Sequence, residues 1–358
     1  MKTIKFSNKN NTNFSAALKK NVNDYFTANG ITKKGNTGTV MKSVVMITLF
    51  LAPFVVMLTV PLSGWVIFPL SVMMGIGMSG IGMSVMHDAV HGSLSRKGWM
   101  NSLLSNTMYL LGGNVFTWKV QHNLLHHTFT NIEGFDQDID SRSIFRFSPR
   151  VPLKKIHRLQ FIYAFFFYSL MSISKLFMDF FNLHKYNRRG IVKDQKTTAG
   201  FEYSRMILSK LAYFFVAIGF PLLFSSFSWW MILIGFLVMH LTAGIIMSVI
   251  FQLAHVVEGT DLTVPDKDGN IETEWAIHEL QTTSNFARNN RLLTWYVGGL
   301  NFQIEHHLFP HICHIHYKNI SPIVEQTAKE FGLSYNLKPS FTHAILSHIR
   351  VLKALGNK

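Results

Sequence analysis

Four long apolar segments constrain the fold of this chain more than any other feature. They cover residues 43–60, 64–86, 206–227 and 229–257, and a helix needs about 20 such residues to span a bilayer. Residues 61–63 join the first pair and residue 228 joins the second, so each pair should form a helical hairpin. Trp65, Trp229 and Trp230 lie at these joints, where tryptophans commonly mark the membrane–water boundary.

The distribution of charge supports a membrane protein. Hydrophobic residues make up 48% of the chain and charged residues 15%, whereas soluble proteins carry about 25% charged residues. The net charge of +15 is typical of proteins that bind nucleic acid or an anionic membrane. However, no Lys or Arg occurs between Lys42 and Arg96, and Lys210 alone interrupts residues 206–257. Basic residues that avoid the apolar segments indicate membrane topology and no nucleic-acid partner.

The same charges predict the orientation. Both hairpin tips are uncharged and the opposite flanks are basic, which places both termini and most polar residues in the cytosol. The membrane would be the cytoplasmic membrane of a bacterium or the endoplasmic reticulum of a eukaryote. Residues 1–40 lack the apolar core of a signal peptide and are expected to form a cytosolic tail. Residues 41–350 would form the membrane domain, and residues 351–358 a C-terminal tail.

A fifth apolar segment, residues 161–181, has strongly basic flanks at both ends. If it crossed the membrane, the histidines before and after it would lie on opposite faces. It also contains Ser169, Lys175 and Asp179, so we expect an interfacial or re-entrant helix. Residues 100–112 resemble a shorter interfacial helix.

Clustered histidines are the strongest functional signal among the 17 in the chain. A pair spaced i, i+4 follows the second apolar segment, a triplet lies near residue 125, a third cluster lies near residue 306, and one histidine ends the fourth segment. All would lie at the cytosolic boundary, where ionisable residues usually have a function. The predicted metal ligands are His87, His91, His122, His126, His127, His255, His306 and His307.

Ligand type narrows the identity of the metal. Eight imidazoles without a thiolate exceed what one tetrahedral zinc can use, and the single Cys313 excludes a four-cysteine site. Imidazole suits iron, copper, nickel and zinc. Two metals with about four nitrogen ligands each would leave open positions for O₂. Iron is the first choice on redox grounds, and copper is the second.

The three histidine motifs, HDxxH, HxxxHH and QxxHH, resemble those of the membrane fatty acid desaturase family, in particular its front-end, linoleoyl-CoA desaturase-like branch. Residues 118–122, 134–140 and 306–310 are also similar to that branch, and the resemblance covers roughly residues 40–350. It implies two iron ions (Fe²⁺/Fe³⁺), O₂ as oxidant, and insertion of a cis double bond into a long acyl chain, on its carboxyl side. The acyl group would be a CoA thioester or part of a membrane lipid.

The chain departs from many front-end desaturases in one respect. It contains neither the His-Pro-Gly-Gly motif of a fused cytochrome b5 domain nor a glycine-rich dinucleotide fingerprint. Electrons are therefore expected from a separate ferredoxin, or from cytochrome b5 with its reductase.

Several polar residues near the motifs have weaker predicted roles. Gln303 is expected to orient a metal-bound water or a neighbouring imidazole rather than to bind the metal. Asp88, Glu258 and Glu305 could accept the second ring N–H of a ligand histidine, or could simply be solvated. The acidic run formed by Asp136, Asp138 and Asp140 is interpreted as a solvated loop, with steering of the second motif or of a substrate head group as the alternative.

The remaining histidines are not expected to bind the metals. His311, His314 and His316 are interpreted as interface or head-group residues. His240 would lie about 22 Å from His255 along one helix, so an interhelical hydrogen bond is predicted for it instead.

Together these features predict an all-α integral membrane fold, in which two hairpins of transmembrane helices carry a cytosolic helical cap that holds a histidine-rich di-iron site. No side chain beyond the metal ligands is expected to act as an acid or base on the carbon. The alternatives are a hydroxylase or ketolase on the same scaffold, a metal-binding membrane carrier, and a haem-binding electron-transfer protein.

Overall fold

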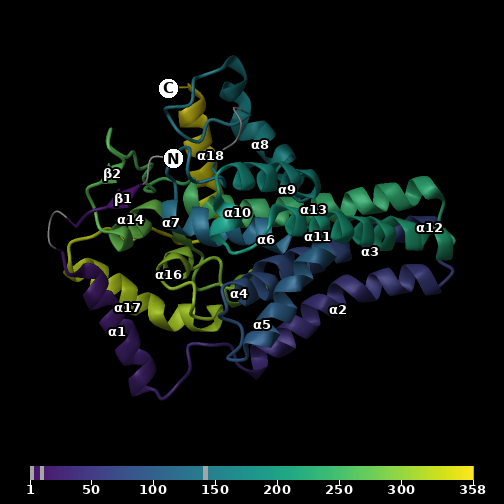
Figure 1. Cartoon of the computed structure of the whole chain (residues 1–358), viewed down its shortest axis with the longest axis horizontal. Coiled ribbons are helices and arrows are strands. Elements are labelled where there is room, and N and C mark those ends of the chain that lie inside the picture. Colours follow the sequence, from purple (N-terminus) through teal and green to yellow (C-terminus); the bar gives the residue numbers. More distant parts are fainter. Residues whose placement is uncertain (1–3, 9–11, 140–143, 358) are drawn as a thin grey trace.

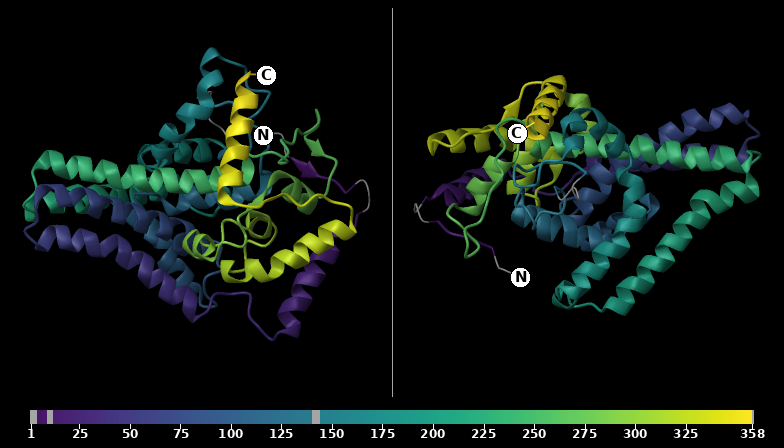
Figure 2. Two further views of the ribbon diagram at one scale, coloured as in Figure 1. Left: turned by 180° about the vertical axis from the view of Figure 1, so that it is seen from behind. Right: turned by 90° about the horizontal axis from the view of Figure 1, so that it is seen from above.

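Four long apolar helices project from one side of a compact helical cap (Figures 1 and 2). The computed structural model describes residues 4–8, 12–139 and 144–357. The helices long and apolar enough to cross a membrane are Thr37–Thr59, Gly64–Val90, Ala199–Phe224 and Trp229–His255. They confirm the predicted all-α membrane fold with two hairpins, and each lies within a few residues of the expected segment.

The first hairpin begins at a well-formed cap. The Asn36 side chain accepts a hydrogen bond from the Thr39 amide, and Thr39 reciprocates, so α2 (Thr37–Thr59) starts before its apolar stretch. The second helix of the hairpin runs through η1 (Gly64–Val66), α3 (Ile67–Gly80), η2 (Ile81–Met86) and α4 (His87–Val90). Its η2 segment is a π-helical turn, a feature that is frequent at functional sites.

Small residues allow α3 to pack closely between two neighbouring helices. A Cβ on Gly77 would lie 2.5 Å from the Phe50 nitrogen of α2. A Cβ on Gly75 would lie 2.6 Å from the Met239 carbonyl oxygen of α13 (Trp229–His255). Close backbone approach of this kind is typical of helix packing in membranes. The partner of α13 in the second hairpin is built from α11 (Ala199–Phe214), η6 (Phe215–Gly219) and α12 (Phe220–Phe224).

The fifth apolar segment is bent rather than straight. η5 (Lys155–Leu159) and α8 (Gln160–Ser169) meet α9 (Met171–Arg188) at an angle of 76°. Whether this pair crosses the membrane stays a prediction, although the histidines before and after it lie together. The other predicted interfacial helix is present as α5 (Gly98–Ser105) and η3 (Asn106–Leu111), with Trp99 and Leu103 exposed.

The cap is assembled from short elements that are distant in sequence. Its remaining helices are α6 (Val115–Trp118), η4 (Lys119–His126), α7 (His127–Phe129), α10 (Ile191–Asp194), α14 (Trp275–Thr282), α15 (Arg291–Tyr296), α16 (Gln303–Leu308), η7 (His314–His316), α17 (Tyr317–Glu330) and α18 (Phe341–Asn357). Two parallel strand pairs join distant segments: β1 (Lys5–Phe6) with β2 (Asn270–Ile271), and β3 (Asn285–Phe286) with β4 (Leu337–Lys338).

Both segments that were expected to be tails contain packed helix. The apolar residues of α1 (Phe14–Ala28) recur every four residues, as Phe14, Leu18, Val22 and Phe26, and are buried in a core shared with α17. At the other end, α18 continues to Asn357. The ends of the chain therefore take part in the cap, as Figure 1 shows for α1 and α17.

Candidate metal centre

The eight predicted ligands come from four separate parts of the chain and converge inside the cap. The first pair lies at the end of the α3–α4 helix, and the triplet lies in η4 and α7. His255 is the last residue of α13, and the last pair lies in α16. Seven of the eight side chains are buried, and His91 is partly exposed.

The histidines form two groups. In the first group, His87, His91, His122 and His306 each offer a ring nitrogen within 4.8 Å of the others. In the second group, His126, His255 and His307 do the same. His127 connects them, because its Nε2 lies 3.2 Å from Nε2 of His122 and its ring centre lies 4.5 Å from that of His307.

The orientation of the ring nitrogens fits metal binding. Nε2 of His91, His126, His255, His306 and His307 is buried without a hydrogen-bond partner, a state that proteins normally avoid. Nε2 of His122 lies 3.1 Å from Nε2 of His87. Two nitrogens bound at right angles to one metal, each at about 2.1 Å, would be roughly 3 Å apart. The unpaired ring nitrogens and this spacing would both be accounted for by metal ions bound between the rings.

The protonation of the isolated protein favours metal binding at most of these positions. Burial lowers the pKa of five histidines well below its usual value, and neighbouring imidazoles lower it further, for His91, His122, His127, His306 and His307. These rings are therefore neutral at physiological pH. A neutral imidazole has the free lone pair that a metal requires.

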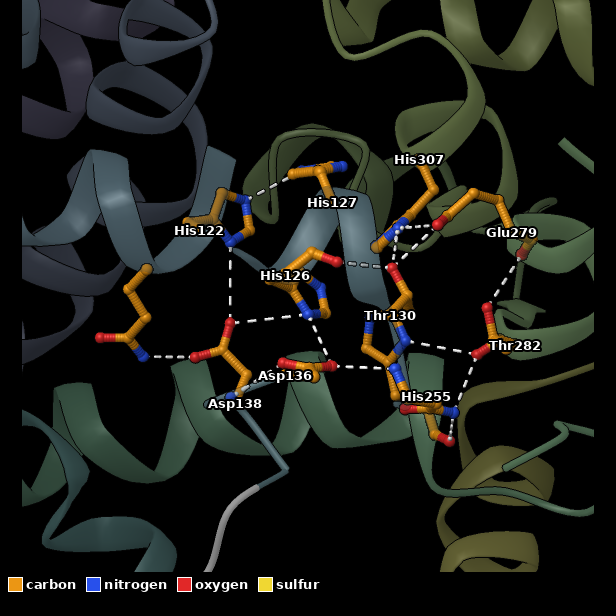
Figure 3. A network of polar contacts seen from close by, with 12 residues as sticks. His122, His126, His127, Thr130, Asp136, Asp138, His255, Glu279, Thr282 and His307 are labelled. Carbon is orange, nitrogen blue, oxygen red and sulfur yellow. Dashed lines mark hydrogen bonds and ion pairs between the residues drawn. The ribbon is translucent and has the colours of Figure 1, made fainter. Parts of the chain in front are cut away.

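His126 differs because a carboxylate lies beside it. Its Nδ1 is 3.0 Å from Oδ2 of Asp136, which also accepts the amide hydrogen of Asn131 (Figure 3). Burial opposes a charge on His126, but Asp136, together with Asp138 and Glu279, outweighs burial and raises the pKa of His126 to about 9. Asp136 is only 1% exposed, so its interpretation as part of a solvated loop is wrong.

The other two members of the acidic run have different outcomes. Asp138 accepts a hydrogen bond from the Gln121 amide, and its Oδ2 is 3.9 Å from Nδ1 of His122. It is partly buried beside the second motif rather than fully solvated. Asp140 lies outside the described residues.

Sequence reasoning missed Glu279, a fully buried carboxylate on α14. Its Oε2 lies 2.7 Å from Nδ1 of His307 and accepts a hydrogen bond from Thr130 Oγ at 2.9 Å (Figure 3). Burial raises the pKa of Glu279 well above its usual value. A carboxylate on the remote nitrogen fixes the ring so that Nε2 faces the metal. No histidine motif lies next to Glu279 in the sequence, and residues 276–282 are of mixed polarity, so no local signal identified it.

The three carboxylates that were proposed as histidine partners differ in outcome. Asp88 is buried, lies 3.7 Å from Nδ1 of His87, and makes a 2.6 Å contact with His314. Of the two alternatives for Glu258, the structure supports the solvated one, since this residue is exposed and paired with Arg350. The role as a histidine partner is wrong for Glu305, which accepts hydrogen bonds from Asn285 and Tyr335.

The remaining histidines and Gln303 complete the surroundings. His314 is buried against Asp88 and Lys42 rather than lying at an interface, whereas His311 is exposed. His240 makes the predicted interhelical hydrogen bonds, to Ser172 and Tyr213. Within the described chain no hydrogen bond joins the Gln303 amide to a histidine, so its orienting role stays a prediction.

A cavity of about 520 Å³ opens onto the first group of histidines. Its wall includes His87, His122, His306 and Gln303. Most of the remaining lining is apolar, with methionines such as Met78 and Met247 from the membrane helices. A polar region lies beside α9, where the lining residues are Gln121, Asp138, Lys175, Asn182 and Lys185.

Comparisons with known proteins agree with this site. The family model for fatty acid desaturases matches residues 63–339. An sn-1 linoleoyl-lipid 6-desaturase of Synechocystis sp. is 35% identical, over 99% of this chain and 98% of that protein. A second enzyme of that name, from Arthrospira platensis, is 32% identical over 96% and 92% of the two chains. An acyl-lipid (8-3)-desaturase of Physcomitrium patens is 30% identical over 99% of this chain and 74% of that protein.

Proposed function

Because this chain belongs to the fatty acid desaturase family, and is thus a membrane oxidoreductase that acts on fatty acyl chains, we propose that it is a front-end acyl-lipid desaturase. It would insert a cis double bond towards the carboxyl end of an acyl chain that remains attached to a membrane lipid. The observation that carries this proposal is the cavity, which brings an apolar channel directly onto His87, His122 and His306. The similar enzymes whose names specify a lipid-linked substrate support the lipid-linked form over a CoA thioester.

The lining of the cavity suggests how a lipid would be oriented. The apolar part runs along α3, η2 and α13, which contribute Met78, Gly82 and Met247 respectively. The polar part lies beside Lys175 and Lys185 of α9. A head group would remain at the polar end, while the acyl chain extends past the histidines between the membrane helices. A fixed head group would then set the distance from the carboxyl end of the acyl chain to the histidines, and thereby the position of the new double bond.

We further propose that the two groups hold two iron ions. The first group would bind one ion, the second group the other, and His127 would lie between them. When bound, iron supplies the activation of O₂ and the one-electron chemistry that removes one hydrogen from each of two adjacent carbons. The protein contributes the positions of the imidazoles. Asp136 and Glu279 hold Nδ1 of His126 and His307, and the surrounding apolar side chains exclude water.

The histidine-bearing cap would face the cytosol, because the basic flanks of the membrane helices are on its side. An external electron donor, a ferredoxin or cytochrome b5 with its reductase, would then have access to it. Reporters fused after Arg189 and at Lys358 should both read cytosolic, and one at Ser63 should read external. An external reading after Arg189 would contradict this topology.

Fatty-acid profiling by mass spectrometry of a host that expresses the protein tests the activity. We expect a new polyunsaturated acid whose additional double bond lies on the carboxyl side of an existing one. Purified protein with an electron donor should convert a labelled phospholipid or glycolipid faster than the corresponding acyl-CoA. Preference for the CoA thioester would overturn the lipid-linked assignment, and a hydroxylated or oxidised product would instead support the hydroxylase or ketolase.

A further inference from the structure

The proposed reaction needs electrons from another molecule. Forming one C=C bond while O₂ is reduced to two waters takes four electrons. Two come from the two C–H bonds that break, and the other two come from a donor, together with two protons. The donor electrons must reach the histidines through a part of the protein that the substrate does not occupy.

His91 lies at a part of the metal centre that the substrate would not occupy. It is the one partly exposed side chain among the eight histidines, and the other seven are less than 9% exposed. His87, His122 and His306 line the substrate cavity, whereas His91 does not. The metal centre therefore has a side that faces the cavity and a separate edge, at His91, that approaches the surface.

The loop between α1 and α2 lies beside this edge. Lys34 Nζ donates hydrogen bonds to the carbonyl oxygens of Gly92, the residue after His91, at 2.9 Å and of His311 at 3.2 Å. The Cys313 amide donates to the Lys33 carbonyl oxygen at 2.8 Å. The loop is thus fixed between the segments that follow the first and the last histidine motifs.

The surface at this loop is strongly basic. We define the basic face as the side chains of Lys19, Lys33, Lys34, Arg96 and Lys97. Arg96 Nε donates to Thr32 Oγ at 3.2 Å, which places it beside the loop. Partial burial lowers the pKa of His311, and the nearby charges of Lys33, Lys34 and Lys19 lower it further.

Few acidic residues are available to neutralise these charges: residues 1–132 contain only Asp24 and Asp88, and Glu325 on the neighbouring α17 pairs with Arg288. No Asp or Glu occurs in residues 25–87, 89–132 or 306–324, and Asp88 between the first two ranges is buried. Asp24 lies on α1, but it pairs with Lys20 at 2.7 Å. The basic face therefore presents a net positive surface next to the least buried metal-site histidine.

We propose that the basic face is the docking site of a small acidic one-electron carrier protein, which delivers the two donor electrons one at a time through the His91 edge. This rests on the proposed desaturase function. Opposite charges steer such partners into contact and orient them. Lys19 is on α1, whose apolar face packs on α17 within the cap, so the basic face extends from the start of α5 onto a cap helix.

The test uses the full-length protein in neutral phosphatidylcholine nanodiscs, with NADPH, a ferredoxin reductase and an acidic [2Fe–2S] ferredoxin as the probe. The variant is K19E/R96E/K97E, which leaves the structural Lys33 and Lys34 in place. We expect the KM for ferredoxin to rise about tenfold or more, with kcat nearly unchanged, because charge at a docking site mainly affects association. The salt dependence of kcat/KM should also weaken.

Two controls make the result specific. K154E/K155E/R158E makes the same change in charge at exposed positions of residues 154–158, next to α8, which lies on the opposite side of the cap from α1 in Figure 1. It should leave the KM for ferredoxin unchanged. Reduced methyl viologen, a small cation that needs no docking site, should support equal turnover in all three proteins. If no protein forms a double bond with viologen, the desaturase function itself has failed, independently of the docking site.

Four results would overturn the docking site. The first is an unchanged KM for ferredoxin in K19E/R96E/K97E. The second is a rise in this KM in K154E/K155E/R158E as large as that in K19E/R96E/K97E. The third is a loss of turnover in K19E/R96E/K97E that is as large with viologen as with ferredoxin, which would indicate damage to the metal centre. The fourth is a rise in KM that appears only in nanodiscs containing anionic phosphatidylglycerol, which would indicate a lipid contact.

Discussion

The two groups of histidines have the same ligand type but different surroundings. In the second group, carboxylates contact Nδ1 of His126 and His307 at 3.0 and 2.7 Å, and the Thr282 carbonyl oxygen lies 3.4 Å from Nδ1 of His255 (Figure 3). In the first group, the shortest contact of this type is that of His306 with the Tyr317 hydroxyl, at 3.2 Å. The second group is enclosed, whereas the first borders the cavity and the basic face. The enclosed group is therefore held by charge, and the accessible group mainly by packing.

The largest effect is expected when one ligand is removed from each group. His255→Ala and His306→Ala should each abolish desaturation and reduce bound iron from about two ions per chain, because each removes a nitrogen that no neighbour replaces. Elemental analysis and product assays measure this. His184→Ala, at an exposed histidine of α9, is the control. If His255→Ala retained both iron and activity, His255 would not belong to the second group.

Replacing the carboxyl group of Glu279 beside the second group should have the next largest effect. Glu279→Gln keeps the size of the side chain but replaces the carboxyl oxygens that contact His307 and Thr130 by an amide, and we expect a 10- to 100-fold loss of iron affinity or activity. Titration with a competing chelator measures the affinity. Glu258→Gln removes a carboxylate of similar type from an exposed ion pair with Arg350 and should change neither iron binding nor activity.

The pH dependence of metal uptake should also distinguish the groups. His126 must lose its proton to bind a metal, and its pKa in the isolated protein is about 9. Affinity at the second group should therefore fall about tenfold for each pH unit below 9. The first group, whose histidines His91, His122 and His306 have lowered pKa values, should not show this slope at neutral pH.

Asp136→Asn tests the cause of that slope. Loss of the Asp136 carboxylate should lower the pKa of His126 from about 9 towards the usual histidine value of about 6.5. The pH below which protons compete with the metal should fall with it. Metal titrations of the apoprotein between pH 6 and 9 measure it. An onset that stayed near pH 9 would show that Asp136 is not the source of the raised pKa of His126.

The smallest effect is expected at Tyr317. Tyr317→Phe removes one neutral hydrogen bond to His306, worth about 1 kcal/mol, or roughly fivefold in affinity. The first group should retain its iron. If this variant lost as much iron as Glu279→Gln, the difference between a group held by charge and a group held by packing would not hold.

The histidines of the site could be predicted because each motif is a short contiguous pattern in the sequence. The helix that carries His87 and His91 continues a membrane span, so depth and spacing together identify the pair. Glu279 could not be found in this way, because it precedes His307 by 28 residues and reaches it from another helix. Asp136 depends on a turn in which Asn131 adopts a φ of 56°, which brings the carboxylate back to His126.

The amino-terminal helix shows a different limit. The four-residue apolar repeat of α1 is visible in the sequence, but the lysines of residues 1–40 and the lack of a signal-peptide core suggested a tail. Its apolar face has a partner only because α17, some 300 residues later, presents a complementary face. Tertiary packing of this range is not encoded in any local pattern.

The packing of α1 against α17 affects the order in which parts of the protein can fold during synthesis. During synthesis the helices of the first hairpin emerge and enter the membrane before the last histidine motif has been translated. The surface that receives α1 belongs to residues 317–330, and strand β4, which pairs with β3, follows later still. Domains near the N-terminus usually fold while synthesis continues. Here the cap, and with it the complete metal centre, can close only after nearly the whole chain has left the ribosome, so truncation near the C-terminus should prevent iron incorporation rather than weaken it.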